Sequence, residues 1–380
     1  MEWMYKQPVQ ILFGSGKIKE LGALAAQLGC RRGLLVCDKY FAENGLAESI
    51  VKDSGGSLWG IFSDLSSNPD VEEVDQCAKT LREGGCDFVA ALGGGSAMDC
   101  AKAASVTAPA GGSVRRFFAG EEPLPGEHLP LIAIPTTAGT GSEVTCVSVL
   151  SDHKEGSKSP IVSDSLYPVY ALIDPQLTYS VPARVTACTG IDVLSHALEG
   201  YWSKGHQPIC DACAVYAIKL VFRYLYRAWQ EPRDTEAREK MAEASVIAGL
   251  SFTLPKTTAP HACSFPLTNL YQIPHGEACG LTLDYFLRLN AASETDGRLA
   301  GLAGELGFAS TGEMADYIYE MKAKMGLRTD LKDLNLTKEQ VKELVRLSHH
   351  PNLFNNPVPV TDDMLFELYG TMNSCSFVLK

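Results

Sequence analysis

Short apolar runs alternate with helical patterns through the first half of the chain, and this alternation constrains the fold more than any other feature. Gly33–Cys37, Leu58–Phe62 and Phe88–Leu92 have the length and composition of buried strands, with helical spacing of apolar residues between them. Because neighbouring parallel strands need long connections, the pattern predicts a parallel sheet with crossover helices. Further strands are predicted at Leu131–Ile134, Thr145–Leu150 and Tyr170–Ile173.

Beyond residue 175 long helical patterns follow one another without a convincing strand. The boundary is expected near residue 180. Residues 1–179 are predicted to form an α/β dinucleotide-binding domain, and residues 180–380 an all-helical domain. The dense loop signals at Pro123–Pro130 and Ser151–Pro168 predict loops at the edge of a site. The helices predicted in the second domain are Gly190–Tyr201, Ile209–Trp229, Thr235–Phe252, Thr311–Met325 and Lys338–Leu347.

The charge and apolar content of the chain argue against several classes of protein. With 45 acidic and 33 basic side chains the net charge is -12, and no basic stripe opposes it, so nucleic acid is not an expected partner. No apolar stretch approaches the roughly 20 residues that span a bilayer. The 12 cysteines lie mostly in apolar runs, as reduced thiols do. A cytoplasmic protein without a membrane partner is therefore expected.

A glycine-rich turn leads from the strand at Phe88–Leu92 into a helix. Gly94 and Gly95 leave the backbone amides free to close on a phosphate, and the helix N-terminus adds favourable dipole charge. Ser96 is in a position to cap this helix. A tight strand–helix connection without a ligand explains the same glycines equally well.

Two other segments strengthen the prediction of a dinucleotide site. Thr136, Thr137 and Thr140 follow the strand at Leu131–Ile134, where hydroxyls suit a ribose and phosphates, although a solvated loop has the same composition. Asp38 directly follows an earlier strand. An acidic residue there commonly binds ribose hydroxyls and repels a 2′-phosphate, which favours NAD over NADP, although surface aspartates are common.

A candidate metal site lies in the second half. Asp192 and His196 are four residues apart in a helical pattern and project from one face, as a metal-ligand pair or a surface hydrogen-bonded pair would. His261 and His275 flank a stretch rich in apolar residues and prolines. One carboxylate and three imidazoles suit Fe(II), Zn(II) or Mn(II).

Four segments resemble the iron-containing (group III) alcohol dehydrogenase family. They are Gly93–Asp99, Pro135–Glu143, Gly190–Glu199 and the stretch from His261 to Gly276. The tail Asn355-Asn356-Pro357 is similar to the closing pattern of the family. The match extends over almost the whole chain, and it implies an N-terminal α/β domain with a parallel sheet and an all-helical, metal-binding and catalytic C-terminal domain.

The resemblance also assigns roles to residues of this sequence. It implies that one divalent metal, usually Fe(II) and in some members Zn(II) or Mn(II), is bound by Asp192, His196, His261 and His275. It implies that His261 and His275 act in catalysis through that metal. For NAD(H) it implies a pyrophosphate site at Gly94, Gly95, Ser96 and Asp99, contacts to ribose and phosphates from Thr136, Thr137 and Thr140, selection of NAD by Asp38, and a contact to the nicotinamide ribose from Lys158.

One position departs from the family pattern. Many members have a histidine four residues after the third metal ligand, where it helps to move a proton, and Phe265 occupies that position here. Water or the cofactor ribose hydroxyls then become the expected proton carriers, and Phe265 is expected to shape the pocket.

The expected reaction is hydride transfer between NAD(H) and a short aldehyde or its alcohol. The stretch Lys256–Phe265 resembles members that reduce aldehydes with an anionic head, such as sulfoacetaldehyde (to isethionate) or phosphonoacetaldehyde; capping hydroxyls and a solvated Lys256 explain it equally well. The alternatives are a general short-chain alcohol or butanol dehydrogenase, a dehydroquinate-synthase-like lyase and a non-catalytic nucleotide-binding protein. The family resemblance suggests a homo-oligomer, a dimer or larger.

Overall fold

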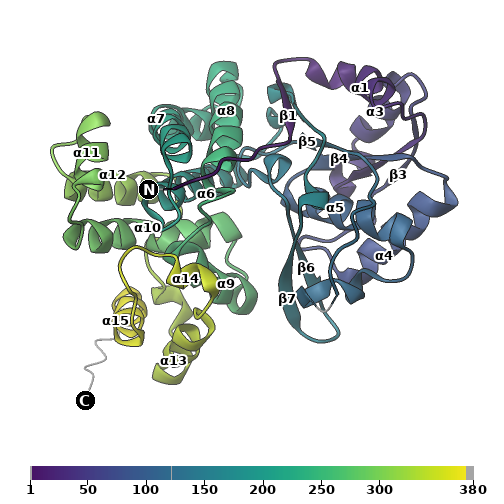
Figure 1. Cartoon of the computed structure of the whole chain (residues 1–380). Helices are drawn as coiled ribbons and strands as arrows, with labels where there is room; N and C mark the ends of the chain where they lie inside the picture. The colour runs from purple at the N-terminus through teal and green to yellow at the C-terminus, as the bar shows by residue number, and fades with distance from the viewer. Residues whose placement is uncertain (1, 121, 374–380) are drawn as a thin grey trace. The chain divides into compact units, whose positions relative to one another are not determined.

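The computed structural model describes residues 2–120 and 122–373, which form two compact units (Figure 1). The first unit comprises Lys6–Ser180. The second comprises residues 2–5 together with the described residues from Val181 onward. The 11 cysteines among the described residues are free, and Cys375 lies outside them. No helix of the described residues is both long enough and apolar enough to cross a bilayer.

The first unit is built around a six-stranded sheet in which every neighbouring pair is parallel, as predicted. Its central strands are wholly buried because they carry continuous apolar runs. In sheet order the strands are β1 (Gln10–Phe13), β8 (Tyr170–Ile173), β5 (Leu131–Pro135), β4 (Phe88–Gly93), β2 (Gly33–Cys37) and β3 (Leu58–Phe62).

Helices cover both faces of this sheet. Along β2, Leu34 and Val36 pack into one hydrophobic cluster with residues of α4 and α5, while Leu35 and Cys37 pack into another with residues of α1 and α3. This alternation follows from the period of two along a strand. The helices of the unit are α1 (Leu21–Gln27), α2 (Lys39–Glu43), α3 (Leu46–Asp53), α4 (Val71–Glu83) and α5 (Gly95–Ala110).

An antiparallel hairpin of β6 (Val147–Asp152) and β7 (Ser157–Val162) completes the first unit. The prediction of a loop over Ser151–Pro168 was therefore wrong for β7. That strand is polar, partly exposed and interrupted by Pro160, so it lacks the apolar alternation that predicts a strand. The short edge strand β1 was also missed, since only four residues carry its signal.

The described residues of the second unit contain helices and no strand, as predicted. The long helix α6 packs against α7, α8 and α10. Its contact with α10 is close: a Cβ at Gly276 would lie 2.1 Å from the Cys188 carbonyl oxygen. The helices are α6 (Ala183–Trp202), α7 (Pro208–Gln230), α8 (Thr235–Phe252), α9 (Ala259–Tyr271), α10 (His275–Ala292), α11 (Arg298–Glu305), α12 (Thr311–Lys324), α13 (Lys338–Leu347), α14 (Pro351–Phe354) and α15 (Asp362–Met372).

Candidate functional site

The carboxyl ends of three neighbouring strands bring predicted cofactor residues together. The register pairs Cys37 with Leu92, and Gly93 with Pro135, so Asp38, Gly94 and Thr136 follow strand ends at one edge of the sheet. Asp38 Oδ2 accepts a hydrogen bond from the Gly94 N–H with an N–O distance of 3.4 Å. The carboxyl edge of a parallel sheet is where such folds bind ligands.

The three glycines of the turn allow side chains to approach its backbone. A Cβ at Gly93 would lie only 2.4 Å from Asp38 Oδ2, so only glycine leaves room for that carboxylate. A Cβ at Gly94 would lie 3.4 Å from Thr137 Oγ1, and one at Gly95 would lie 3.2 Å from Thr140 Cγ2. The predicted threonines therefore lie beside the predicted glycines.

Ser96 and Lys158 meet at a residue that the sequence reasoning did not select. Gly94 is the N-cap of α5, so Ser96 does not cap this helix as expected; its Oγ accepts a hydrogen bond from the Asn68 N–H at 3.2 Å. Lys158 Nζ donates to Asn68 Oδ1 at 2.8 Å. Asn68 has a φ of 63° and precedes a proline after β3, a turn signal that could have identified it.

Both carboxylate oxygens of Asp99 are engaged within the first unit. Oδ1 accepts a hydrogen bond from Ser142 Oγ at 3.2 Å, and Oδ2 accepts one from the Val149 N–H at 3.1 Å. Burial raises the pKa of Asp99 to about 6, although the positive charge of Lys102 acts in the opposite direction. Asp99 thus ties α5 to the β6–β7 hairpin, and its role toward a pyrophosphate stays a prediction.

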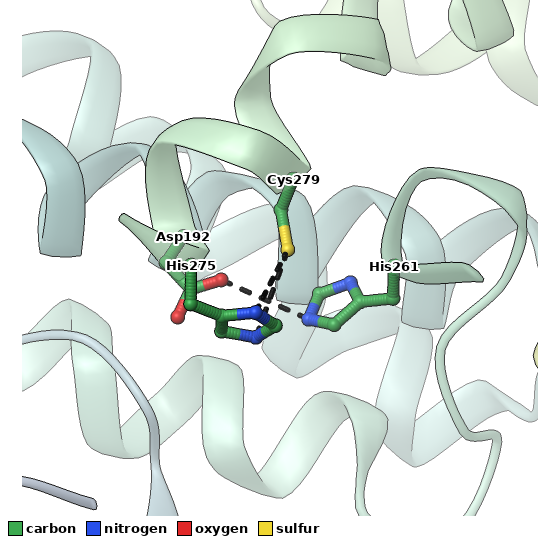
Figure 2. A group of neighbouring side chains, drawn as sticks. All are labelled: Asp192, His261, His275 and Cys279. Carbon is green, nitrogen blue, oxygen red and sulfur yellow. Dashed lines mark hydrogen bonds and ion pairs between the residues drawn. The ribbon is translucent and has the colours of Figure 1, made fainter. Parts of the chain in front are cut away.

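The four predicted metal ligands come from three helices of the second unit. Asp192 and His196 lie one turn apart on α6, His261 lies in the first turn of α9, and His275 is the first residue of α10. His261 Nε2 is 3.7 Å from Asp192 Oδ1 and 3.1 Å from His196 Nε2. Figure 2 shows Asp192, His261 and His275 pointing toward one another.

Cys279, which the sequence reasoning missed, joins this group. One ligand atom from each of Asp192, His261, His275 and Cys279 lies within 4.8 Å of the other three. His196 is not one of these four, but its Nε2 lies 3.1 Å from Nε2 of His261, which is. The spacing of Cys279, four residues after His275 on α10, was the available signal.

A buried carboxylate, also missed, orients His261. Glu199 Oε1 lies 2.6 Å from His261 Nδ1, which assigns the proton to Nδ1 and leaves a lone pair on Nε2. Glu199 Oε2 accepts hydrogen bonds from the N–H and hydroxyl of Thr258, at 2.6 and 3.1 Å. Trp202 Nε1 donates to the same hydroxyl at 2.8 Å. Glu199 is seven residues after Asp192 and therefore on the same face of α6.

The electrostatics of this cluster fit a divalent cation. Asp192 is 3% exposed, and its Oδ1 accepts no hydrogen bond from the part of the chain that the structure describes. Burial raises the pKa of Asp192 to about 7, although His261 acts to lower it. Burial alone would lower the pKa of His261, but the charges of Cys279 and Glu199 raise it well above its ordinary value. A bound cation would satisfy both the carboxylate and the facing lone pairs.

Phe265 lies between His275 and a histidine that the sequence reasoning did not select. Its ring is parallel to that of His275, with centroids 6.3 Å apart, and meets His350 edge-on at 4.7 Å. The Asn352 N–H donates to His350 Nδ1 at 3.2 Å, so in the neutral ring Nε2 carries the proton. Burial lowers the pKa of His350, as does the charge of His261.

The hydroxyls between Lys256 and Phe265 are engaged inside the second unit. Thr257 Oγ1 accepts a hydrogen bond from Asn352 Nδ2 at 2.8 Å, Thr258 binds Glu199, and Ser264 Oγ donates to the His261 carbonyl oxygen at 2.8 Å. Lys256 is exposed. Of the donors proposed there for an anionic head group, the lysine is therefore the one that faces solvent.

Comparison with known families identifies the chain. Residues 8–175 match the family described as iron-containing alcohol dehydrogenase, and residues 186–372 match the Fe-containing alcohol dehydrogenase family, C-terminal. The chain belongs to the iron-containing alcohol dehydrogenase family. This confirms the resemblance found in the sequence and the expected class of enzyme, an oxidoreductase of alcohols and aldehydes.

Individual members of the family are similar over most of their length. The crystal structure of sulfoacetaldehyde reductase from Bifidobacterium kashiwanohense in complex with NAD+ is 56% identical, with a TM-score of 0.97 over 98% of this chain and 99% of that one. NAD-dependent methanol dehydrogenase of Bacillus methanolicus is 32% identical over 89% of this chain and 91% of its own. Sulfoacetaldehyde reductase of Bilophila wadsworthia is 33% identical over 76% of this chain and 75% of its own.

Proposed function

We propose that this member of the iron-containing alcohol dehydrogenase family is an NAD(H)-dependent reductase that converts sulfoacetaldehyde to isethionate. The observation that carries the proposal is the 56% identity, over nearly both whole chains, to the Bifidobacterium kashiwanohense sulfoacetaldehyde reductase. The more distant Bilophila wadsworthia relative is also a sulfoacetaldehyde reductase. Phosphonoacetaldehyde, which has the same length and an anionic head, is the second substrate to test.

The proposed metal ligands are Asp192, His196, His261 and His275, with Fe(II) as the expected ion and Zn(II) or Mn(II) as alternatives. A divalent metal bound there supplies Lewis-acid polarisation of an aldehyde oxygen. His261 and His275 serve catalysis by holding that ion, and Glu199 keeps Nε2 of His261 available to it. The buried Oδ1 of Asp192, which accepts no hydrogen bond within the described residues, supports its assignment as the anionic ligand.

The proposed NAD site is the turn after β4. The Asp38 carboxylate would accept hydrogen bonds from the ribose hydroxyls and would repel a 2′-phosphate. The backbone N–H groups of Gly94 and Gly95 would bind the pyrophosphate. The other proposed cofactor residues are Ser96, Asp99, Thr136, Thr137, Thr140 and Lys158. The close approach of Thr137 and Thr140 to the turn supports this for the threonines.

Two side chains are proposed to act on the substrate side of the second unit. Phe265 forms an apolar wall beside His275 and excludes water from that side of its ring. His350 lies against Phe265, and the Nε2–H of its neutral ring can donate a hydrogen bond that orients a water molecule or a substrate oxygen, while water and the ribose hydroxyls stay the expected proton carriers. A cytoplasmic location and a homodimer stay predictions.

A panel of aldehydes tests the proposed function. Metal-loaded protein is mixed with NADH and sulfoacetaldehyde, phosphonoacetaldehyde or butanal, and NADH oxidation is followed; chelator-treated protein is the control. We expect kcat/KM for sulfoacetaldehyde to exceed that for butanal by at least about 100-fold, because polar groups that bind a charged head are left unpaired by butanal. A preference for butanal would identify a general alcohol dehydrogenase instead. No turnover of any aldehyde would favour a non-catalytic protein.

A further inference from the structure

The thiol of Cys279 lies among the proposed metal ligands. Cys279 is wholly buried and lies one turn after His275 on α10. Its Sγ is 3.7 Å from His275 Nε2 and 3.9 Å from His275 Nδ1. Ligand atoms of Asp192 and His261 lie within 4.8 Å of this sulfur. Figure 2 shows the sulfur turned toward the same point as the two imidazoles and the carboxylate.

The separations between these atoms suit ligands of a single ion. A nitrogen and a sulfur at about 2.1 and 2.3 Å from one ion lie roughly 3.1 Å apart at a ligand angle of about 90° and roughly 3.6 Å apart at about 109°. The Sγ–Nε2 distance to His275 is 3.7 Å, and the distance from His261 Nε2 to Asp192 Oδ1 is also 3.7 Å. Since four such atoms lie within 4.8 Å of one another, small side-chain rotations would let them share an ion.

An independent observation points to the same position. Asp192 Oδ1 is buried and accepts no hydrogen bond within the described residues, although it lies in the group that contains the thiol. His261 Nε2 lies 3.7 Å from this oxygen, too far for a hydrogen bond, and a buried carboxylate oxygen without a hydrogen bond is costly unless a cation satisfies it. Cys279 therefore lies beside a buried carboxylate that a metal ion would satisfy, and not merely in an apolar part of the core.

We propose that Cys279 is a further ligand of the metal centre and binds the ion through Sγ as a thiolate. On coordination a sulfur lone pair forms the bond to the metal, and the Sγ–H proton passes to solvent. The proposal rests on the metal site of the proposed function and adds a sulfur donor to its carboxylate and imidazoles. Because thiolate is a soft ligand, it shifts the preference of the site from Mn(II) toward Zn(II).

Cobalt substitution tests the sulfur ligand directly. Co(II) is added to the metal-depleted full-length protein, bound cobalt is counted by elemental analysis, and thiolate-to-cobalt charge transfer is recorded in the near ultraviolet. We expect the band in the wild-type protein and in Cys263→Ser, and its loss in Cys279→Ser with cobalt still bound. Cys263 is a matched control because it is a wholly buried cysteine of α9 that lies outside this group of four side chains.

The outcomes of this experiment distinguish failure of the proposed sulfur ligand from failure of the proposed metal site. Wild-type protein that binds one cobalt without the band overturns the sulfur ligand and leaves the metal site intact. A band that persists in Cys279→Ser, or disappears in Cys263→Ser, also overturns it. Protein that binds no cobalt at all contradicts the metal site itself, and the sulfur ligand with it.

Competition between metals provides a second measurement. Wild-type protein and Cys279→Ser are equilibrated with Zn(II) and Mn(II) together, and both bound metals are measured. We expect the ratio of bound Zn(II) to bound Mn(II) to be at least about tenfold lower in the variant than in the wild-type protein, since a hydroxyl is a harder donor than a thiolate. An unchanged ratio of bound metals would contradict the proposal.

Discussion

A single carboxylate, Glu199, determines which nitrogen of His261 is available to a metal. It is fully buried, and both oxygens accept hydrogen bonds, from His261 Nδ1 on one side and from Thr258 on the other. The imidazole is therefore held in one tautomer and one orientation. Such a carboxylate affects metal affinity without touching the metal.

Glu199→Gln is expected to weaken metal binding by roughly 10- to 100-fold. A carboxamide has only one acceptor oxygen, so its NH2 group must face either His261 Nδ1 or the donors of Thr258. The dissociation constant is measured by competition with a chelator of known affinity. Glu243→Gln is the control, because Glu243 on α8 bonds with Tyr216 and Lys240. Unchanged affinity in Glu199→Gln would remove the residue from the metal centre.

Charged side chains are buried in the first unit as well. Glu143 is 2% exposed, and Lys102 is wholly buried with its Nζ donating to Ser142 Oγ, Thr145 Oγ1 and the Val147 carbonyl oxygen. Burial raises the pKa of Glu143 to about 7 and lowers that of Lys102 to about 8. Stability of this unit should therefore depend on pH.

The Glu143 contribution to stability is expected to disappear as pH rises from about 4.5 to about 7. Over that interval the folded state holds a proton that the unfolded state has released, so the free energy of unfolding falls by roughly 1.4 kcal/mol per pH unit. Glu143→Gln cannot titrate. Urea unfolding at pH 5, 6 and 7 should show the variant gaining stability relative to wild type as pH rises. A difference independent of pH would contradict the shifted pKa.

Helix α10 reaches the ligands of α6 because glycine lets the two helices approach closely. A Cβ at Gly276 would lie 2.1 Å from the Cys188 carbonyl oxygen and 2.8 Å from Asp192 Cβ. Farther along α10, a Cβ at Gly280 would lie 2.7 Å from Ile191 Cγ1. The same contact that packs the helices therefore sets the separation between His275 and Asp192.

Gly276→Ala is expected to separate the two helices, to cost about 1–3 kcal/mol of stability and to weaken metal binding. Gly301→Ala on α11 is the control, because its Cβ would meet no atom within 4 Å. That variant should gain about 0.5–1 kcal/mol from helix propensity and bind metal normally. Thermal unfolding with and without metal measures both effects. Equal stability and equal metal binding in the two variants would show that the close packing of α6 against α10 does not hold the metal site together.

The elements that sequence predicts well are those whose local pattern decides their structure. The apolar runs of β2, β3 and β8 predicted the first and last residues of these strands correctly. The polar strand β7 forms by pairing with β6, which its own residues do not indicate. Helix α9 contains Pro260 and Pro266, which obscured it. The grouping of Asp192, His261 and His275 followed from resemblance. Glu199 and Cys279 have helical spacings that many other residues share, so only tertiary packing reveals them.

The whole chain divides the proposed chemistry between two compact units. The candidate NAD residues lie within Lys6–Ser180, and the candidate metal ligands lie beyond Val181. Each set is held by hydrogen bonds and packing within its own unit. A ligand that binds only the folded state stabilises the part of the protein that it contacts.

Metal and NAD+ are therefore expected to protect different amide hydrogens from exchange. At a ligand concentration 100 times Kd, binding adds about 2.7 kcal/mol to the free energy needed to open the region that holds the ligand. Hydrogen exchange that requires this opening is therefore slowed by roughly 100-fold. Hydrogen-exchange mass spectrometry should show metal protecting peptides of α6, α9 and α10, and NAD+ protecting those of Gly33–Asp38 and Gly93–Ser96. Chelation is the control for the first effect and NADP+ for the second. Metal that protects the glycine turn as strongly as α6 would contradict this division, because the metal ligands all lie in the other unit.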